Sequence, residues 1–73
     1  MERNKTLDDL KEANVSLKLK GTDGNAFSIL AKCKRAAEEF GCTIKAVDEL
    51  MSEMRSGDYD HLLATATKHF NIQ

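Results

Sequence analysis

One segment of this sequence alternates apolar and polar residues, and it stands ahead of three segments with helical periodicity. Its apolar members are Val15, Leu17 and Leu19, and the residues between them are polar. An alternation with a period of two predicts a strand that buries one face. A lone strand leaves a row of backbone N–H and C=O groups without partners, so another segment has to pair with it.

Three segments can complete this strand. They are residues 69–73, the N-terminal residues, and the same strand of a second copy of the chain. The third choice predicts a homodimer with an antiparallel ribbon across a two-fold axis, and its interface consists of Val15, Leu17 and Leu19. A chain of 73 residues buries a smaller share of its surface than a larger domain does, so a second subunit would add stability.

Glycines and capping residues divide the rest of the sequence into three helices that end near Phe40, Arg55 and Phe70. Apolar residues recur at spacings of three and four in each of them, which is typical of helices that bury one face. Short connections make consecutive helices pack against each other. The expected turn and cap residues are Gly21, Asp23, Gly24, Asn25, Gly41, Thr43, Gly57 and Asp58.

These patterns predict a mostly α fold, in which a short N-terminal β-strand precedes a compact three-helix cluster in the order (α)βααα. The bracketed element is a short helix, because Thr6 and Asp9 have the spacing of a capping box. We expect residues 1–14 to form this short helix or to be partly disordered. Residues 15–73 are expected to form a single β-ααα domain.

Charge and composition narrow the range of partners. The 11 basic and 12 acidic side chains give a net charge of −1, which predicts no general attraction to nucleic acid or to anionic membranes. No apolar run is long enough to span a bilayer, and the first residues do not resemble a signal peptide. Two cysteines without an export signal are typical of a reducing compartment, so we expect a cytoplasmic protein.

Residues that could hold a metal or perform catalysis lack the spacing that such sites require. Cys33, Cys42, His61 and His69 include no close pair of the zinc-binding kind, so we expect buried thiols and two histidines on helix surfaces. Asp58 stands near His61, but an N-cap explains it without catalysis. A chain this short has little room for a substrate pocket. We therefore predict no enzymatic activity, no cofactor and no metal.

A DNA-binding helix-turn-helix is an alternative interpretation of the first two long helices. Ala37, Gly41, Val47 and Leu50 lie where such a motif needs small, turn and buried residues. However, residues 43–60 have a local charge of −3, which repels DNA. A nucleic-acid interface would therefore need a basic patch elsewhere, and the candidates for it are Lys18, Lys20, Lys32, Lys34 and Arg35.

Two turn segments resemble those of a group of small bacterial and phage proteins with no assigned activity. The first runs from Lys20 to Phe27 and contains Gly-Thr-Asp-Gly-Asn-Ala-Phe. The second runs from Ser56 to Leu63 and reads Ser-Gly-Asp-Tyr-Asp-His-Leu-Leu. The resemblance covers about residues 17–70. It implies a shared βααα-like domain and a cytoplasmic setting, and no catalytic residue carries over from it.

We therefore expect a small, non-enzymatic protein-interaction or accessory protein, and we consider a homodimer through the strand as one form of it. Met51 and Met54 extend the apolar face of one helix, where methionine either completes a core or forms an adaptable binding surface. The alternative function is a nucleic-acid-associated regulator that uses the basic patch and the helix-turn-helix-like hairpin. The local negative charge argues against that alternative.

Overall fold

The chain begins with a helix rather than with a strand. The computed structural model describes residues 3–19 and 25–73. These residues form α1 (Leu7–Ala13), β1 (Ser16–Leu17), α2 (Ala26–Phe40), α3 (Ile44–Arg55), α4 (Tyr59–His69) and β2 (Asn71–Ile72). The expectation of a mostly α fold is confirmed. The expectation of a strand as the N-terminal element is wrong, because α1 precedes it and a second strand follows α4.

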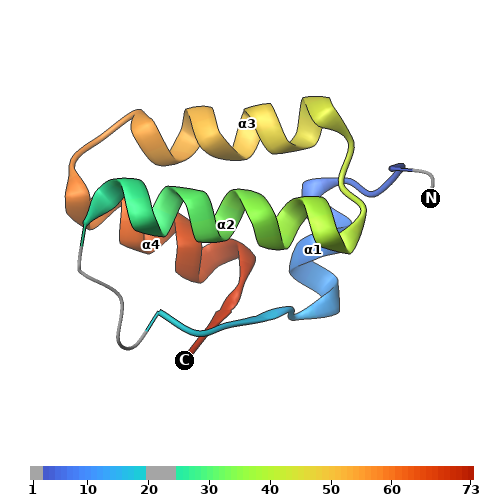
Figure 1. The fold of residues 1–73 in the computed structure, drawn as a ribbon, viewed down its shortest axis with the longest axis horizontal. Helices are drawn as coiled ribbons and strands as arrows, with labels where there is room; N and C mark the ends of the chain where they lie inside the picture. Colours follow the sequence, from blue (N-terminus) through green and yellow to red (C-terminus); the bar gives the residue numbers. More distant parts are fainter. Residues whose placement is uncertain (1–2, 20–24) are drawn as a thin grey trace.

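The helices surround one apolar core. In Figure 1, α2 and α3 run in opposite directions along the long axis, α4 lies behind α2, and α1 closes one end of the molecule. Each long helix directs its apolar face inward, because residues three and four positions apart share a side of the helix. The largest fully buried side chains are Leu10, Cys33, Cys42, Leu50 and Met54.

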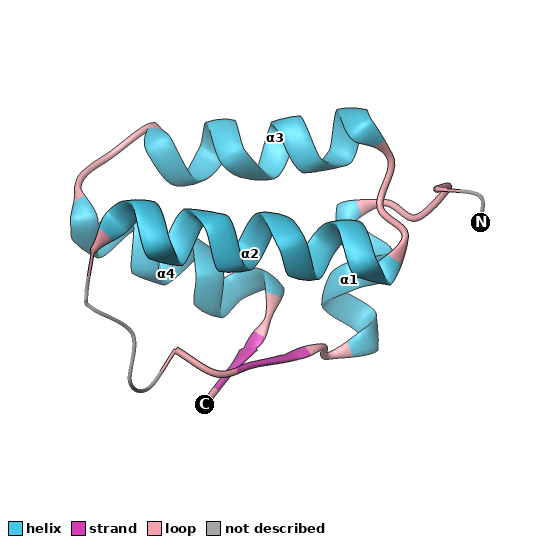
Figure 2. Cartoon of the chain, in the orientation of Figure 1, coloured by secondary structure: helices cyan, strands magenta, loops and turns pink. Residues whose placement is uncertain are grey.

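The two strands form a parallel sheet that joins distant parts of the chain (Figure 2). Ser16 lies opposite Asn71 in this sheet. The Asn71 N–H donates to the Val15 carbonyl oxygen at 2.8 Å, and the Gln73 N–H donates to the Leu17 carbonyl oxygen at 3.0 Å. The partner of the predicted strand is therefore the segment after α4, which is one of the three choices that the sequence left open.

This pairing within the chain supplies a partner for one edge of the predicted strand, so the edge that meets β2 does not require a second copy of the chain. Val15, Leu17 and Leu19 are half-buried and pack against the core of their own chain. The alternation with exposed polar residues persists as predicted, although β1 is shorter than the predicted strand. One backbone edge of β1 is filled by β2, so dimerisation is not needed to satisfy it.

The N-terminal segment is tied to the same core. The Thr6 hydroxyl accepts from the Asp9 N–H and the Asp9 carboxylate accepts from the Thr6 N–H, which is the predicted capping box at the start of α1. Leu10 of this helix is fully buried. The Lys5 N–H donates to the Gly41 carbonyl oxygen at 2.9 Å, so the residues before α1 are held against the end of α2.

The described caps lie where the sequence places them. Asn25, Thr43 and Asp58 are the N-caps of α2, α3 and α4, and each side chain accepts a hydrogen bond from a backbone N–H of the first turn. Gly41 ends α2 with a φ of 104°, a conformation that glycine adopts without strain. Among the other predicted turn residues, those outside the described part of the chain are Gly21, Asp23 and Gly24.

The interface of α3 and α4 settles one open question and corrects one prediction. Met51 and Met54 are 8% and 0% exposed, so they complete the core rather than a binding surface. The predicted surface position of His69 is wrong, because only 6% of this residue is exposed. His69 and Thr65 are four residues apart, so they share the face of α4 that packs on α3, and both are buried there.

Candidate functional site

A groove of about 480 Å³ runs between the β1 segment and one face of α2. The residues of α2 that line it are spaced by three and four, so they form a single stripe along the helix. Ala36 and Phe40 lie half-buried in this stripe, and the charged residues beside them are exposed. The full lining consists of Val15, Ser16, Leu17, Lys18, Lys32, Arg35, Ala36, Glu39 and Phe40.

Two sets of residues that the sequence analysis kept separate meet in this groove. Val15 and Leu17 come from the predicted strand interface, and Lys18, Lys32 and Arg35 come from the predicted basic patch. The remaining members lie elsewhere. Leu19 packs against the core, Lys34 is exposed on α2 without lining the groove, and Lys20 is outside the described residues.

Sequence reasoning missed four members of the lining, which are Ser16, Ala36, Glu39 and Phe40. Ala36 and Phe40 belong to the apolar residues of α2, whose periodicity predicts a helix that buries one face in the core. The signal that could have identified them is their spacing of four beside Lys32 and Arg35, which places an apolar pair and two cations on neighbouring parts of one helix surface.

The cations of the groove make contacts at its rim. The Lys32 Nζ donates to the Lys18 carbonyl oxygen at 3.2 Å. The Arg35 Nε donates to the Glu39 carboxylate at 3.0 Å, and the two side chains are 82% and 65% exposed. An ion pair this exposed adds little stability, because water and salt screen it. The groove therefore combines a half-buried apolar floor with a basic, water-exposed rim.

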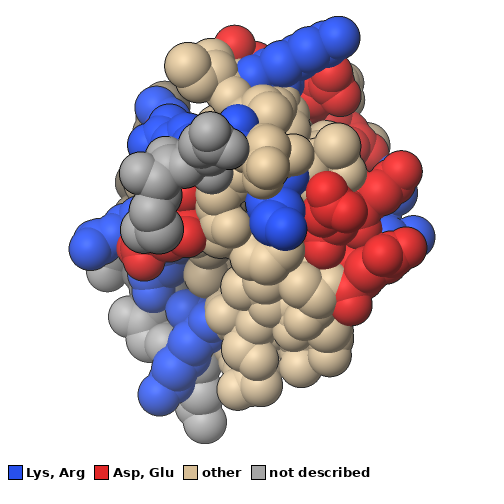
Figure 3. All heavy atoms as spheres, turned by 90° about the vertical axis from the view of Figure 1, so that its right-hand side faces the viewer, with Lys and Arg blue, Asp and Glu red and all other residues tan. Residues whose placement is uncertain are grey.

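Charge is distributed unevenly over the end of the molecule shown in Figure 3. Lys and Arg side chains lie mostly at the left of this view and Asp and Glu mostly at the right, with uncharged residues between them. The left-hand side corresponds to the front of Figure 1, where α2 lies, and α1 lies behind. The acidic first turn of α1 contains Asp8 and Asp9.

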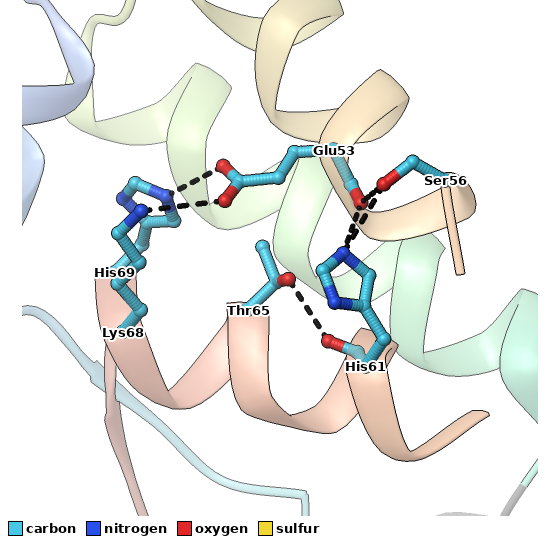
Figure 4. A network of polar contacts seen from close by, with 6 residues as sticks. All are labelled: Glu53, Ser56, His61, Thr65, Lys68 and His69. Atoms are coloured by element: carbon cyan, nitrogen blue, oxygen red, sulfur yellow. Dashed lines mark hydrogen bonds and ion pairs between the residues drawn. The ribbon is translucent and has the colours of Figure 1, made fainter. Parts of the chain in front are cut away.

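A network of polar side chains joins α3 to α4 on the side of Glu53 (Figure 4). The Glu53 carboxylate accepts from His69 Nε2 at 3.2 Å and from Lys68 Nζ at 3.3 Å. The hydrogen bond from His69 is the main cause that lowers the pKa of Glu53 below its ordinary value of 4.5, and Lys68 adds to it against an opposing effect of burial. The buried His69 Nδ1 has no hydrogen-bond partner among the described residues.

The Ser56–His61 pair in Figure 4 has the distance of a nucleophile and its base but not the arrangement. Ser56 Oγ and His61 Nε2 are 3.1 Å apart, yet both also contact the Glu53 carbonyl oxygen, at 2.7 and 3.0 Å. A carbonyl oxygen only accepts, so the two groups donate to it and close the end of α3. Asp58 accepts from the backbone N–H of His61, so it caps α4 rather than orienting the ring.

The cysteines are buried within the core as predicted. Cys33 and Cys42 are both free thiols with 0% exposure. Burial raises the pKa of Cys33 to about 11, and burial together with the nearby Asp9 raises the pKa of Cys42. The described residues include no group of three or more His, Cys, Asp or Glu side chains placed to hold a metal ion.

The predicted helix-turn-helix hairpin exists as a packing unit. Ala37, Val47 and Leu50 are buried between α2 and α3, and Gly41 forms the turn. However, the two helices run antiparallel along the molecule, whereas DNA-binding hairpins cross at a steep angle (Figure 1). This geometry differs from that of a helix presented to the major groove.

A second hollow, of about 400 Å³, lies where α2 begins beside the α3–α4 connection. Leu30, Met54 and Leu62 contribute to its lining, and Phe27 and Tyr59 stand at it with 80% and 42% exposure. Two of the three large apolar side chains that are exposed in the described part of the chain, Phe27 and Tyr59, therefore line the same hollow. Unlike the groove beside β1, this hollow has no strand edge and only one cation, Arg55, in its described lining.

Comparisons with protein-family models, with curated proteins and with solved structures found no match to this chain. Among the helices of the described residues, none combines the length and the apolar character that crossing a bilayer requires.

Proposed function

We propose that the protein is a small, non-enzymatic interaction module that binds a partner protein in the groove between β1 and α2. The observation that carries this proposal is the composition of the groove, in which a half-buried apolar floor lies beside Lys18, Lys32 and Arg35. Protein-binding sites combine an apolar centre with a polar rim in the same way.

A protein partner fits the groove better than a nucleic acid does. The apolar floor formed by Ala36 and Phe40 offers nothing to a phosphate, whereas it can take an apolar side chain. Binding of a nucleic acid in the groove would therefore contradict the proposal.

A peptide selection tests the proposal directly. Random dodecapeptides are displayed and selected on the folded protein, and each enriched peptide is titrated into ¹⁵N-labelled protein. We expect the largest amide shifts in residues 15–18 and 32–40, because these line the groove. The proposal fails if no peptide is enriched, or if the shifts centre on the hollow at Phe27 and Tyr59.

A pair of matched variants provides a second readout. Ala36→Glu places a carboxylate on the floor of the groove, and Ala64→Glu makes the same change at an exposed site on α4. We expect peptides to bind the first variant about tenfold more weakly or worse and the second as they bind the original protein, because an unpaired charge in an apolar contact is costly. Equal binding to both variants contradicts the proposal. Thermal melting of each variant confirms that it is folded. The amide-shift experiment uses the unmodified protein, so it still tests the proposal if a variant fails to fold.

A further inference from the structure

One backbone edge of β1 belongs to β2, and the other faces α2 across the groove. The ladder with β2 uses the carbonyl oxygens of Val15 and Leu17. Successive residues of a strand direct their N–H and C=O groups to opposite sides, so those of Ser16 and Lys18 point away from β2. Lys32 of α2 reaches the Lys18 carbonyl oxygen, which places this outer edge beside the groove.

The outer edge keeps hydrogen-bonding capacity for a partner. Among the described residues, none pairs with the backbone N–H or C=O of Ser16. An exposed strand edge accepts a further extended segment through main-chain hydrogen bonds, and neighbouring pockets then select its side chains. The half-buried side chains of Val15, Leu17 and Phe40 supply the apolar contacts that such a segment needs on one side.

The charge of the groove indicates which side chains a bound extended segment would carry on the side away from the apolar residues. The groove contains three cations and one carboxylate, and that carboxylate, Glu39, pairs with Arg35. The ammonium of Lys32 lies against a carbonyl oxygen of the edge itself. Acidic side chains that alternate with apolar ones would place their carboxylates near these cations, because alternate residues of a strand share a face.

We infer that the groove takes an extended, acidic peptide segment of a partner protein, which adds to the outer edge of β1 as a further strand. The inference rests on the proposed function and specifies its occupant. A strand that pairs with Ser16 and Lys18 continues the β2–β1 sheet toward α2, so the apolar floor, the basic rim and the strand edge all contact the same ligand.

The first test modifies the peptide and leaves the protein unchanged. Dodecapeptides enriched on the protein are resynthesised with one backbone N-methyl group at successive positions, which removes one N–H at a time. Strand addition predicts a loss of about tenfold or more at alternate positions of the central segment and little change between them. The enriched sequences are also expected to carry Asp or Glu at alternate positions. A loss without this period of two overturns the inference.

The second test modifies the edge of the protein. Ser16→Pro removes the outward N–H and leaves the groups that bond β2, whereas Ser16→Ala keeps this N–H and removes only the hydroxyl. We expect about tenfold weaker peptide binding for the proline variant and unchanged binding for the alanine variant. Lys32→Gln should weaken peptide binding severalfold without making the affinity more dependent on salt concentration. Lys34→Gln changes a lysine of the same helix outside the groove, so it should leave peptide binding unchanged.

The outcomes separate this inference from the proposed function. If no peptide is enriched, both fail. If peptides shift the groove amides but bind Ser16→Pro and Ser16→Ala equally, the groove binds proteins in another way and only the strand pairing is overturned. If Lys32→Gln and Lys34→Gln behave alike, the acidic character is overturned. If a 20-base-pair DNA duplex displaces the peptides, the occupant of the groove is a nucleic acid rather than a peptide. If light scattering detects a concentration-dependent dimer that Ser16→Pro abolishes, the occupant is a second copy of the chain.

Discussion

The backbone N–H of Asn71 donates to the carbonyl oxygen of Val15 at 2.8 Å, and this bond anchors β1 to the end of α4. β1 has only two residues, so its position depends on β2 rather than on its own length. The groove lies on the opposite edge of β1, next to α2. The candidate site is therefore held in place by hydrogen bonds on the side away from it.

Asn71→Pro tests this anchoring. The substitution removes the N–H that Val15 accepts and leaves the carbonyl oxygen without its partner, so we expect unfolding to become easier by about 1–3 kcal/mol. Amide exchange at Leu17 and Leu19 should accelerate as well, because the ladder opens there. Asn71→Ala is the control, because it removes the side chain and keeps the N–H. Equal urea denaturation curves for the two variants would contradict the anchoring.

Leu10→Ala tests whether α1 is part of the folded core. The side chain of Leu10 is fully buried, so its truncation should reduce the free energy of unfolding by about 2–5 kcal/mol. Lys11→Ala, on the exposed side of the same helix, should change it by less than about 0.5 kcal/mol. Chemical denaturation measures both. A loss of less than about 1 kcal/mol for Leu10→Ala would indicate that residues 1–14 fray without the rest of the domain.

Glu53→Gln tests the polar network between α3 and α4 through its pH dependence. The pKa of Glu53 is lowered in the folded protein, chiefly by the hydrogen bond from His69, so its ionised form stabilises the fold above the ordinary Glu pKa. This stabilisation is lost as the pH falls through the lowered value. We expect Glu53→Gln to be less stable than the original protein near pH 7, with a difference that shrinks as the pH falls from about 5 to 3.

The matched control for this network is Glu49→Gln, an exposed position on the same helix. Its stability relative to the original protein should change little over the same pH range. Thermal melting at several pH values compares the three proteins. A difference between Glu53→Gln and the original protein that stays constant down to pH 3 would show that the ionised carboxylate does not stabilise the fold.

Gly57→Ala tests the close approach between the α3–α4 connection and His61. A Cβ at this position would lie 2.7 Å from the His61 ring, so the ring must move and lose its 3.0 Å contact with the Glu53 carbonyl oxygen. We expect a loss of stability of about 1–3 kcal/mol. In a His61→Gly background, which removes the His61 Cβ as well as the ring, the collision disappears, and Gly57→Ala should become neutral or slightly stabilising. Equal costs in the two backgrounds, from a double-mutant cycle in urea, would rule out the collision.

Local chemistry made the helices predictable. The caps formed by Thr6, Asn25, Thr43 and Asp58 bond to backbone groups two or three residues away, so their spacing in the sequence is sufficient to identify them. The burial of Cys33 follows from the periodicity of α2 in the same way, whereas Cys42 is buried in the connection between α2 and α3. The alternation of apolar and polar residues was sufficient to identify the strand. The alternation did not predict the length of the strand or its place in the order of elements.

The burial of His69 was missed because the expectation of a surface position rested on its residue type. His69 stands seven residues after Leu62 and three after Ala66, on the buried side of α4. The imidazole can be buried there because α3 supplies Glu53 as its partner. A polar side chain can be buried when a neighbouring element satisfies it, and that neighbour is not adjacent in the sequence. Phe40 also depends on an element that is distant in the sequence, because it packs on the core and lines the groove only where β1 lies beside α2.

The amino-acid order was enough to specify the helices, their caps and the apolar faces, because the interactions behind them span three or four residues. It left open which of three segments completes the strand, because all three could supply the missing hydrogen bonds equally well. The folded chain resolves that choice by packing α1, α2 and α4 so that residues 71–73 lie beside β1. The same packing brings β1 next to the basic face of α2, so the candidate groove exists only in the assembled fold.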